Sequence, residues 1–559
     1  MPVIIVFHFG QNIHSIKKGQ IGLEKRGIFL YVFLLLGLIG TIASVLYVNV
    51  QSYSTVSQSY NSTSITADTS RGTIYDCKKR PLVNSEYQYI AVVPPSVSYL
   101  SQVYKYQLSQ TDISRVASGF PICVQVDADF ESDDIPVLKV PKRYDADALC
   151  AHIIGYLDDE GNGVSGIEKA FNEQLTGGEL NVYFKKDALG NTLAGEEAQI
   201  QREDYDHVGS VVLTIDKDIQ RITATAANAF IEKGAVVVLE NATGKIRAMC
   251  SLPDFSQNNL EASLNSTDSP FVNRALSGYN AGSVFKLCTA AAALEAGVSY
   301  TCTCKGYTDV GGVTFHCMQE HGTVDMQTAL EKSCNVYFIE LSQKLSATPL
   351  YNMAQNMGFG TSIELCDGIV ADKGVLPELA DIKRNPAALA NFAFGQGSLL
   401  ATPLQIASML QCISNKGQRI RPSLIEEVTD QNGVLIEQAK LSAPTNVISE
   451  ETAGTLLSYM VSVVENGTGK NAKPATGGAG GKTATAETGW KDENGNDMVQ
   501  TWFAGVFPAK DPIYTVVVLS ENGKSGSESA APVFKKIADH VNALEHRVEP
   551  ETDSDLEKK

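Results

Sequence analysis

Hydrophobic and polar positions are arranged in three ways along the chain, and each pattern predicts a different kind of element. Residues 28–50 are an apolar run without a charged side chain, long enough for a helix to cross the roughly 30 Å hydrocarbon core of a membrane. Short β-branched runs predict strands at 235–240 and 246–251, joined by a turn, and again at 501–508 and 513–522. Longer runs such as the Ala-rich 286–298 predict helices between them.

These patterns divide the chain into parts. Strands at both ends of residues 208–544 with helices between them predict an α/β (α+β) sandwich closed by pairing between strands far apart in the sequence. Residues 51–207 begin with a Ser/Tyr/Thr-rich stretch and continue with short β-type runs, which predicts a stalk and a mixed, elongated, non-catalytic domain. Residues 545–559 are charged and lack an apolar stripe, which predicts a disordered acidic tail.

Basic residues flank the apolar run on one side. Lys17, Lys18, Lys25 and Arg26 precede it, and no basic residue follows until Arg71. The positive-inside rule therefore predicts a cytoplasmic segment 1–27, a single transmembrane helix at 28–50 and an extracytoplasmic remainder. A cleaved signal peptide is the alternative, but its apolar region is shorter, about 7–15 residues, and ends at small residues.

Composition narrows the classes of function. The chain has 559 residues, of which 43% are hydrophobic and 19% charged, so two or more packed units are expected. The formal net charge is −18, and no basic cluster lies beyond the N-terminal segment. Nucleic acid is therefore excluded as a partner, because phosphate binding needs clustered Lys and Arg.

Two short motifs place candidate catalytic groups inside the sandwich. Ser283 and Lys286 are three residues apart at the start of the Ala-rich helical run, so both side chains lie on one face of its first turn and the amine can take the proton of the hydroxyl. Ser333 and Asn335 offer a hydroxyl and an amide at the start of a second helix. Each motif alone is weak, since a helix cap with a solvated lysine explains it equally well.

A third motif lies near the C-terminal strands. In GGKTATAE, Lys482, Thr483 and Thr485 lie on an extended segment that is predicted to be an edge strand. The order S-x-x-K, S-x-N and K-T-x, all within one predicted domain, resembles the transpeptidase domain of the penicillin-binding proteins, which share these motifs with the serine β-lactamases. Further stretches, at 70–76, 151–177, 393–407 and 501–508, resemble the monofunctional class B enzymes.

The resemblance implies a peptidoglycan D,D-transpeptidase of cell-wall synthesis on the outer face of the cell membrane. It implies stem peptides or a lipid-linked precursor polymer as substrate, β-lactam antibiotics as inhibitors and a membrane glycosyltransferase as partner. A role in cell shape, division or sporulation stays open, the last through likeness to stage V sporulation protein D. Residues 51–207 leave no room for the glycosyltransferase domain of class A relatives.

The same resemblance assigns roles to the motif residues. Ser283 attacks the carbonyl between the two terminal D-alanines, Lys286 is the general base, and Ser333 relays a proton to the leaving amine. Asn335 hydrogen-bonds the substrate backbone. The terminal carboxylate is bound by the third motif, Lys482, Thr483 and Thr485, and the N–H groups of Ser283 and Thr485 form the oxyanion hole. No metal or organic cofactor is required for this chemistry.

Two departures from the family pattern keep two rival functions open. Ala484 and Ala281 stand where relatives usually have Gly and Pro, so a catalytically impaired scaffold is one rival. A β-lactamase is the other, although it needs a deacylating carboxylate. Because side chains alternate along a strand, we expect Ala484 to point to the face opposite Thr483 and Thr485, against a helical layer and away from the ligand.

Cysteines form a second cluster of candidate residues. The chain has 11, an odd and large number for an exported protein. Cys304, Cys317, His321 and Cys334 flank the second motif, and three thiols with one imidazole suit a tetrahedral zinc ion, which some class B relatives hold at similar positions. A regulatory Cys304–Cys317 disulfide, as in sporulation-type relatives, and merely buried thiols are the alternatives.

Overall fold

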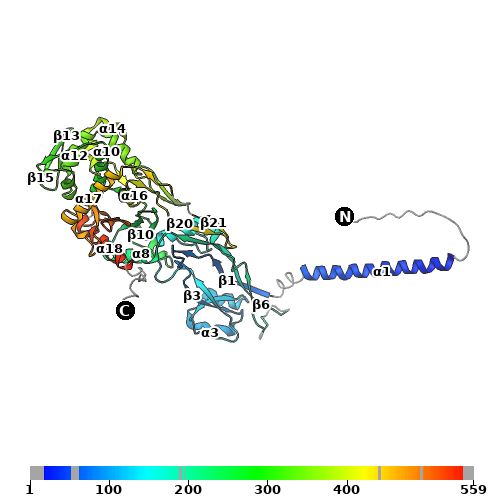
Figure 1. The fold of residues 1–559 in the computed structure, drawn as a ribbon. Coiled ribbons are helices and arrows are strands. Elements are labelled where there is room, and N and C mark those ends of the chain that lie inside the picture. The colour runs from blue at the N-terminus through cyan, green and yellow to red at the C-terminus, as the bar shows by residue number, and fades with distance from the viewer. Residues whose placement is uncertain are drawn as a thin grey trace, which may run out of the picture. The chain divides into compact units, whose positions relative to one another are not determined.

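The computed structural model describes residues 18–51, 62–187, 192–193, 196–438, 442–491, 495 and 497–545, and Figure 1 shows its ribbon. The chain forms two compact units. The first comprises Met1–Ala67, Tyr89–Leu138 and Asn181–Gln201, and the second comprises Asp68–Gln88, Lys139–Leu180 and Arg202–Lys559. Most of the predicted cytoplasmic segment and nearly all of the predicted tail lie outside the described residues, and the boundary at 207/208 stays a prediction.

The apolar run forms one long helix. Helix α1 spans Lys18–Gln51, and its segment Phe29–Leu46 has a mean hydropathy of 2.4 with none of it buried against protein. A charge-free helix satisfies its own backbone hydrogen bonds, and its exposed apolar side chains need a nonpolar environment. The segment is thus long and apolar enough to cross a membrane, as a single transmembrane helix requires.

The first unit contains much of a small sheet with the strand order β4-β3-β5, in which β3 and β4 pair antiparallel. Its core is aliphatic and includes Val93, Val124 and Ile135. Helix α4 begins with a capping box between Ser109 and Asp112, which satisfies backbone N–H groups at the start of the helix. The elements are β3 (Glu86–Val93), η1 (Val97–Tyr99), α3 (Leu100–Val103), η2 (Tyr104–Tyr106), α4 (Gln110–Ala117), β4 (Ile122–Val126) and β5 (Val137–Lys142). Another sheet has the order β1-β6-β7, formed by β1 (Ser62–Arg71), β6 (Thr176–Lys185) and β7 (Gln199–Glu203).

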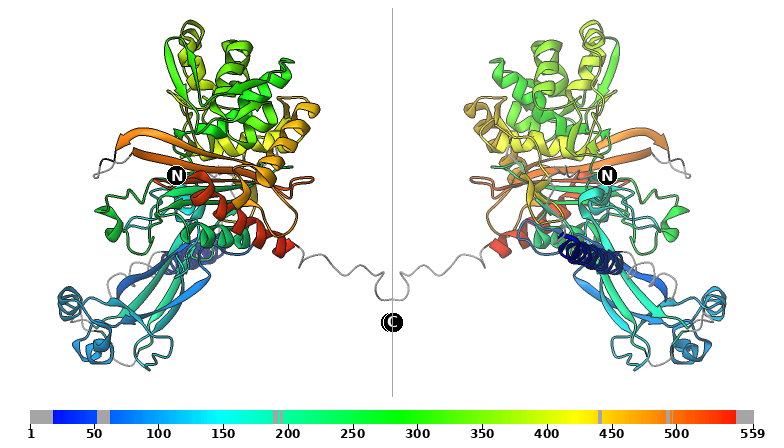
Figure 2. Two further views of the ribbon diagram at one scale, coloured as in Figure 1. Left: turned by 90° about the vertical axis from the view of Figure 1, so that its left-hand side faces the viewer. Right: turned by 90° about the vertical axis from the view of Figure 1, so that its right-hand side faces the viewer.

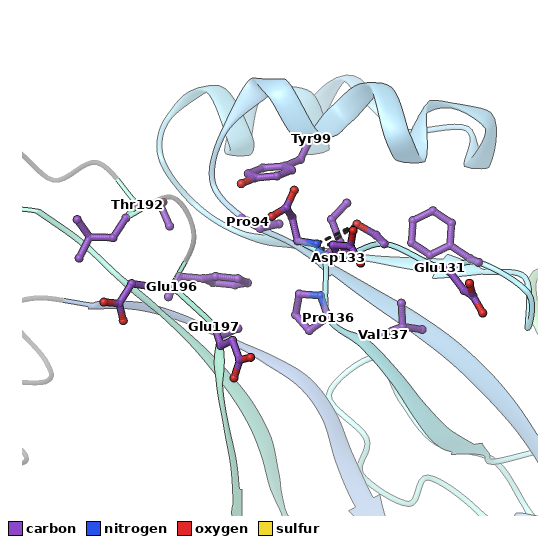
Figure 3. Close-up of a pocket in the computed structure, with 16 residues that line it drawn as sticks. Pro94, Tyr99, Glu131, Asp133, Pro136, Val137, Thr192, Glu196 and Glu197 are labelled. Carbon is purple, nitrogen blue, oxygen red and sulfur yellow. Dashed lines mark hydrogen bonds between the residues drawn. The ribbon is translucent and has the colours of Figure 1, made fainter.

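The first unit also holds an open cleft of about 800 Å³ (Figure 3). Tyr99 contributes an aromatic wall, and several carboxylates line the cleft, among them Glu131, Asp133, Glu196 and Glu197. No Lys or Arg is found among the described lining residues, so the local potential is negative. All motif residues belong to the second unit, so this cleft is not the predicted active site.

The second unit is built on a five-stranded sheet with the order β10-β9-β25-β24-β23. All four of its neighbouring strand pairs are antiparallel. The hairpin near residue 240 therefore pairs with strands almost 300 residues later, which confirms the predicted non-local closure. The strands are β9 (Gly234–Glu240), β10 (Ile246–Leu252), β23 (Gly480–Lys491), β24 (Asp497–Phe507) and β25 (Tyr514–Glu521). Strands β23 and β24, orange in Figure 2, lie side by side at one edge.

Helices cover both faces of this sheet. Because side chains alternate along each strand, successive strand residues pack against different groups of helices. Val236 and Val238 pack with α8 (Lys217–Asn228) and α18 (Ala531–Glu545). Val237 and Leu239 point to the other face and join the larger core, to which α10 (Lys286–Glu295), α12 (Asn335–Leu345), α16 (Pro403–Ser414) and α17 (Glu450–Asn466) contribute. The short η5 (Gly526–Ala530) precedes α18.

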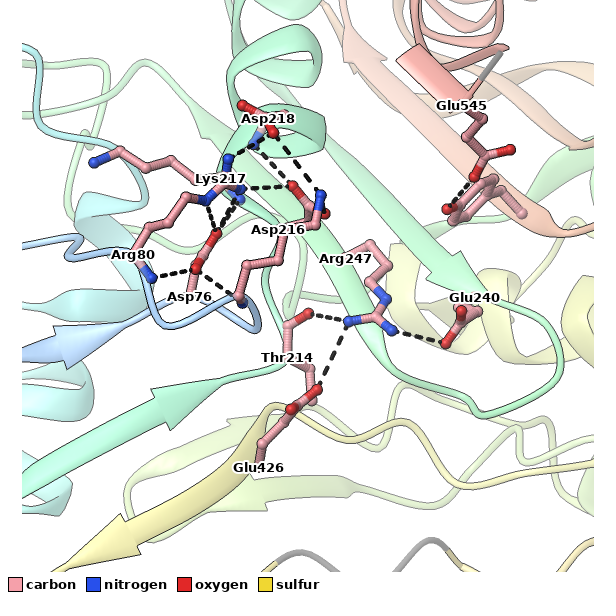
Figure 4. Close-up of polar contacts among 12 residues, drawn as sticks. Asp76, Arg80, Thr214, Asp216, Lys217, Asp218, Glu240, Arg247, Glu426 and Glu545 are labelled. Carbon is pink, nitrogen blue, oxygen red and sulfur yellow. Dashed lines mark hydrogen bonds and ion pairs between the residues drawn. The ribbon is translucent and has the colours of Figure 1, made fainter. Parts of the chain in front are cut away.

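A second sheet, of order β2-β8-β20-β21, belongs to the same unit. It consists of β2 (Ile74–Tyr75), β8 (Ser210–Leu213), β20 (Ile425–Thr429) and β21 (Leu435–Gln438). Polar contacts beside it fix the segment that follows β2 (Figure 4): Arg80 pairs with Asp76, Asp216 and Asp218 at 2.6 to 3.0 Å. Burial of Asp76 would raise its pKa, but hydrogen bonds from Arg80 and Lys217 lower it below the usual range.

A buried ion triad lies elsewhere in this unit. Glu168 is fully buried and accepts charge-assisted hydrogen bonds from Arg71 at 2.6 Å and Arg143 at 2.7 Å. Removal of the carboxylate would leave two cations without a counter-charge, which is costly in a protein interior. Arg71 comes from 70–76 and Glu168 from 151–177, two of the stretches that carried the family resemblance.

Short elements complete the second unit. They are α5 (Ala151–Ile154), α6 (Gly166–Ala170), α7 (Asn172–Leu175), α9 (Glu261–Leu264), β11 (Tyr279–Asn280), η3 (Gly282–Phe285), β12 (Cys302–Cys304), β13 (Tyr307–Val310), β14 (Val313–His316), β15 (Gly322–Val324), α11 (Met326–Glu331), α13 (Ala347–Asn356), β16 (Ile363–Cys366), β17 (Ile369–Ala371), α14 (Leu379–Arg384), α15 (Pro386–Ala393), β18 (Leu400–Ala401), β19 (Gln418–Arg419), β22 (Thr445–Asn446) and η4 (Lys470–Ala472).

Candidate active site

Ser283 lies in a tight turn that leads directly into a buried helix. The turn is η3, and Lys286 is the first residue of α10. Gly282 adopts a left-handed conformation with φ +54°, and a methyl group there would lie only 2.9 Å from the Ala486 Cβ. Glycine is thus required immediately before the serine, both for the backbone angle and for the close approach to β23.

The second motif joins two helices. Ser333 has φ +54° and lies between the end of α11 and the start of α12. Cys334 caps α12, and its sulfur accepts a hydrogen bond from the Tyr337 N–H at 3.5 Å. The left-handed turn directs the Ser333 hydroxyl and the Asn335 Oδ1 toward the same buried lysine, Lys286.

Two buried amines meet at the Ser333 hydroxyl. The Lys482 Nζ lies 3.0 Å from the Ser333 Oγ, and the Lys286 Nζ lies 3.4 Å from it. The Lys286 amine also donates to the Ser333 carbonyl at 2.8 Å and to the Asn335 Oδ1 at 2.7 Å. Side chains from three distant segments, the first residue of α10, the α11–α12 loop and β23, therefore form one hydrogen-bonded network.

Burial controls the protonation of this network. Desolvation lowers the pKa of Lys286 to about 8, against a smaller opposing effect of nearby cysteine thiolates. Desolvation also holds the pKa of Lys482 well below its usual range, and the neighbouring Lys286 cation lowers it further. Two ammonium groups that share one hydroxyl disfavour each other's charge, so a neutral amine becomes accessible near neutral pH.

The third motif lies on the edge strand β23, with its side chains on alternate faces. Lys482 points to Ser333, and Ala484, on the same face, packs beside Gly282. On the opposite face, the Thr483 Oγ1 lies 2.7 Å from the Thr468 Oγ1, and the Thr485 Oγ1 accepts from the Gly526 N–H at 3.3 Å. The prediction that Ala484 and the two threonines lie on opposite faces is confirmed.

The direction predicted for Ala484 needs a correction. We expected its methyl group to point away from the nucleophile, but a methyl built on Gly282 would lie 3.3 Å from the Ala484 Cβ. The helical layer that it meets begins with the turn that carries Ser283. The sequence could show the alternation of faces but not which of two helical layers lies on each face. Ala281, the other departure, has φ −70°, close to the value that proline imposes, so the backbone angle at this position is one that proline can adopt.

Asn280 is a positioning residue that the motifs did not reveal. Its N–H donates to the Gln500 Oε1 at 2.6 Å, its Nδ2 donates to the Glu487 carbonyl at 2.9 Å, and its carbonyl accepts from the Trp502 Nε1 at 3.0 Å. These bonds join the approach to Ser283 to the edge strand β23 and to its neighbour β24. No spacing rule marks such a residue, because its partners are more than 200 positions away.

The four predicted metal ligands also come together. Cys304, Cys317, His321 and Cys334 have ligand atoms that all lie within 4.8 Å of one another, and we refer to them as the Cys3His cluster. The His321 Nδ1 is 3.7 Å from the Cys304 Sγ and 3.4 Å from the Cys317 Sγ, and the Cys317 and Cys334 sulfurs are 3.9 Å apart. The three cysteines of the cluster are free thiols in the structure.

The cluster adjoins the second motif directly. The Asn335 N–H donates to the Cys317 Sγ at 3.2 Å, and Cys334 separates the two motif residues. A hydrogen bond from the Cys334 thiol, together with this backbone N–H, lowers the pKa of Cys317, whereas its thiolate raises the pKa of Cys334. The first proton lost by the pair therefore comes from Cys317, which favours metal binding.

A hydroxyl nucleophile one turn before a desolvated lysine, with a second hydroxyl shared between two amines, defines a serine acyl-transfer enzyme. Comparison with known proteins identifies the family of serine acyl-transfer enzymes to which the chain is similar. Residues 234–539 match the family model of the penicillin binding protein transpeptidase domain. The chain is 31% identical to penicillin-binding protein PbpB of Mycolicibacterium smegmatis over 71% of its own length and 64% of that protein. It is 30% identical to stage V sporulation protein D of Bacillus subtilis over 78% of its own length and 70% of that protein.

Solved structures agree with this assignment. The D,D-transpeptidase domain of a peptidoglycan glycosyltransferase from Eggerthella lenta superposes with a TM-score of 0.62 at 25% identity, covering 86% of this chain and 99% of that one. The chain belongs to the penicillin-binding protein transpeptidase family, and it is a class B, serine-type D,D-transpeptidase.

Proposed function

We propose that this chain cross-links peptidoglycan stem peptides by forming an acyl-enzyme on Ser283, and that β-lactam antibiotics acylate the same hydroxyl. The observation that carries the proposal is the convergence of Lys286 and Lys482 on the Ser333 hydroxyl, beside the turn that holds Ser283. This geometry supplies a base with a lowered pKa and a proton relay within one buried network, one turn away from the nucleophile.

Each motif residue has a step in the reaction. The Ser283 Oγ attacks the carbonyl of the penultimate D-alanine and gives its proton to the neutral Lys286 amine. The C–N bond then breaks, and the leaving D-alanine takes a proton through Ser333. Lys286 returns its proton to Ser333 and is neutral again. An amine of a second stem peptide then attacks the acyl carbonyl and gives its proton to Lys286, which passes it to the Ser283 oxygen as the ester C–O bond breaks. The backbone N–H groups of Ser283 and Thr485 stabilise the oxyanion of both tetrahedral intermediates.

Substrate binding falls to the remaining motif residues. Lys482, Thr483 and Thr485 bind the terminal carboxylate of the donor peptide, for which a cation and two hydroxyl donors are suited. Asn335 keeps one amide N–H for the substrate backbone, since among the described residues its Nδ2 donates to the His316 carbonyl alone, at 3.2 Å.

Labelling with a fluorescent penicillin tests the proposal against its rivals. Persistent label on the full-length protein, abolished in Ser283→Ala, is expected of a transpeptidase. Rapid loss of label would instead identify a β-lactamase, and a folded protein without label would identify a scaffold. The partners of the Lys286 amine among the described residues include no carboxylate, which supports slow deacylation.

The apolar helix α1 and the basic residues before its apolar segment support a proposed membrane topology. We place residues 1–27 in the cytoplasm, the helix in the membrane and the catalytic unit outside, where it acts beside a membrane glycosyltransferase that supplies the polymer. An ectodomain beginning at Tyr53 should stay soluble and be acylated at the rate of the full-length protein. Aggregation, or loss of labelling in the ectodomain alone, would show that the anchor does more than attach the enzyme.

The Cys3His cluster fits a structural zinc ion. Zn–S bonds of about 2.3 Å and Zn–N bonds of about 2.0 Å give tetrahedral edges of about 3.8 Å between sulfurs and about 3.5 Å between sulfur and nitrogen. Three of the six separations, 3.9, 3.7 and 3.4 Å, match these edges, and all six are within 4.8 Å. The ion would tie β12 and the loop after β14 to Cys334, and thereby hold Ser333 and Asn335 in place.

Metal analysis with thiol titration tests this site. Protein purified without reductant should contain one zinc per chain and release it on mercurial titration of the thiols. One disulfide in metal-free protein would favour the Cys304–Cys317 alternative. Metal-free protein with all eleven thiols titratable would contradict both.

A further inference from the structure

Thr468 connects two of the three motifs although no motif contains it. It follows α17 in the short loop 467–469, between two glycines. Its Oγ1 lies 2.7 Å from the Thr483 Oγ1, and its backbone N–H donates to the Glu331 carbonyl at 3.0 Å. Glu331 is the last residue of α11, two positions before Ser333.

The loop is held tightly on both sides. A methyl group on Gly467 would lie 2.5 Å from the Glu331 carbonyl oxygen, so this loop and the end of α11 are in van der Waals contact. The N–H groups of Gly467 and Gly469 both donate to the Val463 carbonyl, at 3.0 and 3.1 Å. The Glu331 side chain accepts from Ser462 of α17 and from Gln327. Thr468 is thus fixed with respect to the helix end that carries Ser333.

The number of protons on each group determines which hydroxyl donates in the contact between Thr468 and Thr483 once substrate is bound. A carboxylate only accepts hydrogen bonds, and a hydroxyl has one proton to donate. When the Thr483 proton points to a substrate carboxylate, its bond to Thr468 survives only with Thr468 as the donor. Among the described residues, Thr468 is the hydrogen-bond partner of the Thr483 hydroxyl. The neighbouring Lys482 does not compete for this hydroxyl, because its amine donates to the Thr483 carbonyl and to Ser333.

We infer that Thr468 is a positioning residue that orients the Thr483 hydroxyl toward the terminal carboxylate of the acyl donor, and so contributes to the selection of substrates that end in a free carboxylate. The inference rests on the proposed function, because it takes the carboxylate site at Thr483 from there. Thr468 acts through Thr483 and leaves the reacting carbonyl untouched. Its loss weakens binding of the ground state and the transition state alike.

The test compares benzylpenicillin with its methyl ester, which lacks the carboxylate. Acylation of the full-length protein in detergent is followed by intact mass, and the dissociation constant is separated from the acylation step. Thr468→Val keeps the shape and removes the donor, so benzylpenicillin should bind about tenfold more weakly with an unchanged acylation step. The ester should react with this variant as with the parent, and Thr468→Ser should restore the preference for the acid.

Controls separate positioning from folding. Thr455→Val removes a threonine hydroxyl from α17, away from the loop, and should leave both reactions unchanged. Thr483→Val should also lose the preference for the acid, and the double variant should lose no more than Thr483→Val alone. An equal loss for acid and ester in Thr468→Val, or no loss for either, would overturn the inference. If the parent protein itself is not acylated at Ser283, it is the proposed function that fails.

Discussion

Ala484→Gly should make the enzyme faster and less stable at once. The Ala484 side chain is 3% exposed and packs beside Gly282, the residue before the nucleophile. Loss of a buried methyl group costs about 0.8 kcal/mol, and glycine within a strand costs a further 0.5–1 kcal/mol or so. The free energy of unfolding should therefore fall by about 1.5 kcal/mol, which lowers the Tm of a unit of this size by a few degrees.

The rate should change in the opposite direction. The methyl group lies between β23 and the turn of Ser283, so it sets the spacing of the two N–H groups proposed for the oxyanion hole. One such donor typically contributes ~3 kcal/mol. If the methyl group costs a third of that amount, about 1 kcal/mol, its removal should raise the second-order rate of penicillin acylation about fivefold.

A matched variant separates packing from catalysis. Ala486 is fully buried and faces the same glycine, since a methyl on Gly282 would lie 2.9 Å from its Cβ. Ala484 forms the peptide bond that carries the Thr485 N–H, whereas Ala486 follows Thr485, so Ala486→Gly should lose a similar stability without the gain in rate. Stopped-flow acylation and thermal unfolding of both variants provide the comparison. A rate for Ala484→Gly equal to or below that of the parent, or an equal gain in Ala486→Gly, would refute the reasoning.

Three further predictions follow from buried charges and the cysteines. Because burial lowers the pKa of Lys286 to about 8, and the neutral amine is the base, acylation should increase with pH and level off above about 8. The titratable groups near this amine are Lys482, which shares the Ser333 hydroxyl with it, and the thiols of Cys317 and Cys334. A profile without change between about pH 6 and about pH 9 would contradict this assignment. Glu168→Gln should cost about 3–5 kcal/mol of unfolding free energy in chemical denaturation, since Arg71 and Arg143 would lose their counter-charge; a loss below about 1 kcal/mol would refute the buried triad. In the folded parent protein, the pKa of Glu168 is lowered despite burial, because Arg143 and Arg71 stabilise the carboxylate. The stability that this carboxylate contributes is therefore complete above the unfolded pKa of about 4.3 and is lost as the pH falls through the folded pKa. Chelation of metal bound at the Cys3His cluster should lower the Tm of the catalytic unit, and an unchanged Tm after complete metal removal would contradict a structural role.

Local patterns in the sequence predicted much of the fold. The β9–β10 hairpin, the strands β24 and β25 and the helix that begins at Lys286 all form where apolar periodicity placed them. Their closure into one sheet was also predictable, because strands at the two ends of a domain need partners. The division of the chain between two units could not be predicted from local patterns, because segments 68–88 and 139–180 fold with residues far along the chain.

The site was predicted to a similar extent. Motif order identified Ser283, Ser333 and Lys482. The side chains of Ser333 and Lys482 are in contact, and Lys286, which follows the turn of Ser283, joins them. Contacts without a fixed spacing could not be predicted: the Thr468 hydroxyl partner of Thr483 and the anchoring of Asn280 depend on how distant loops pack. The direction of Ala484 was missed for the same reason.

The most direct test of the central claim is peptide mapping of the acyl-enzyme formed with a stem-peptide mimic that ends in D-Ala-D-lactate. After rapid quenching, the account predicts an ester on Ser283 that has lost the terminal D-lactate and that a D-amino acid acceptor removes as a new peptide. Acylation at any other residue, or a folded protein that shows none while Ser283 is intact, would contradict it.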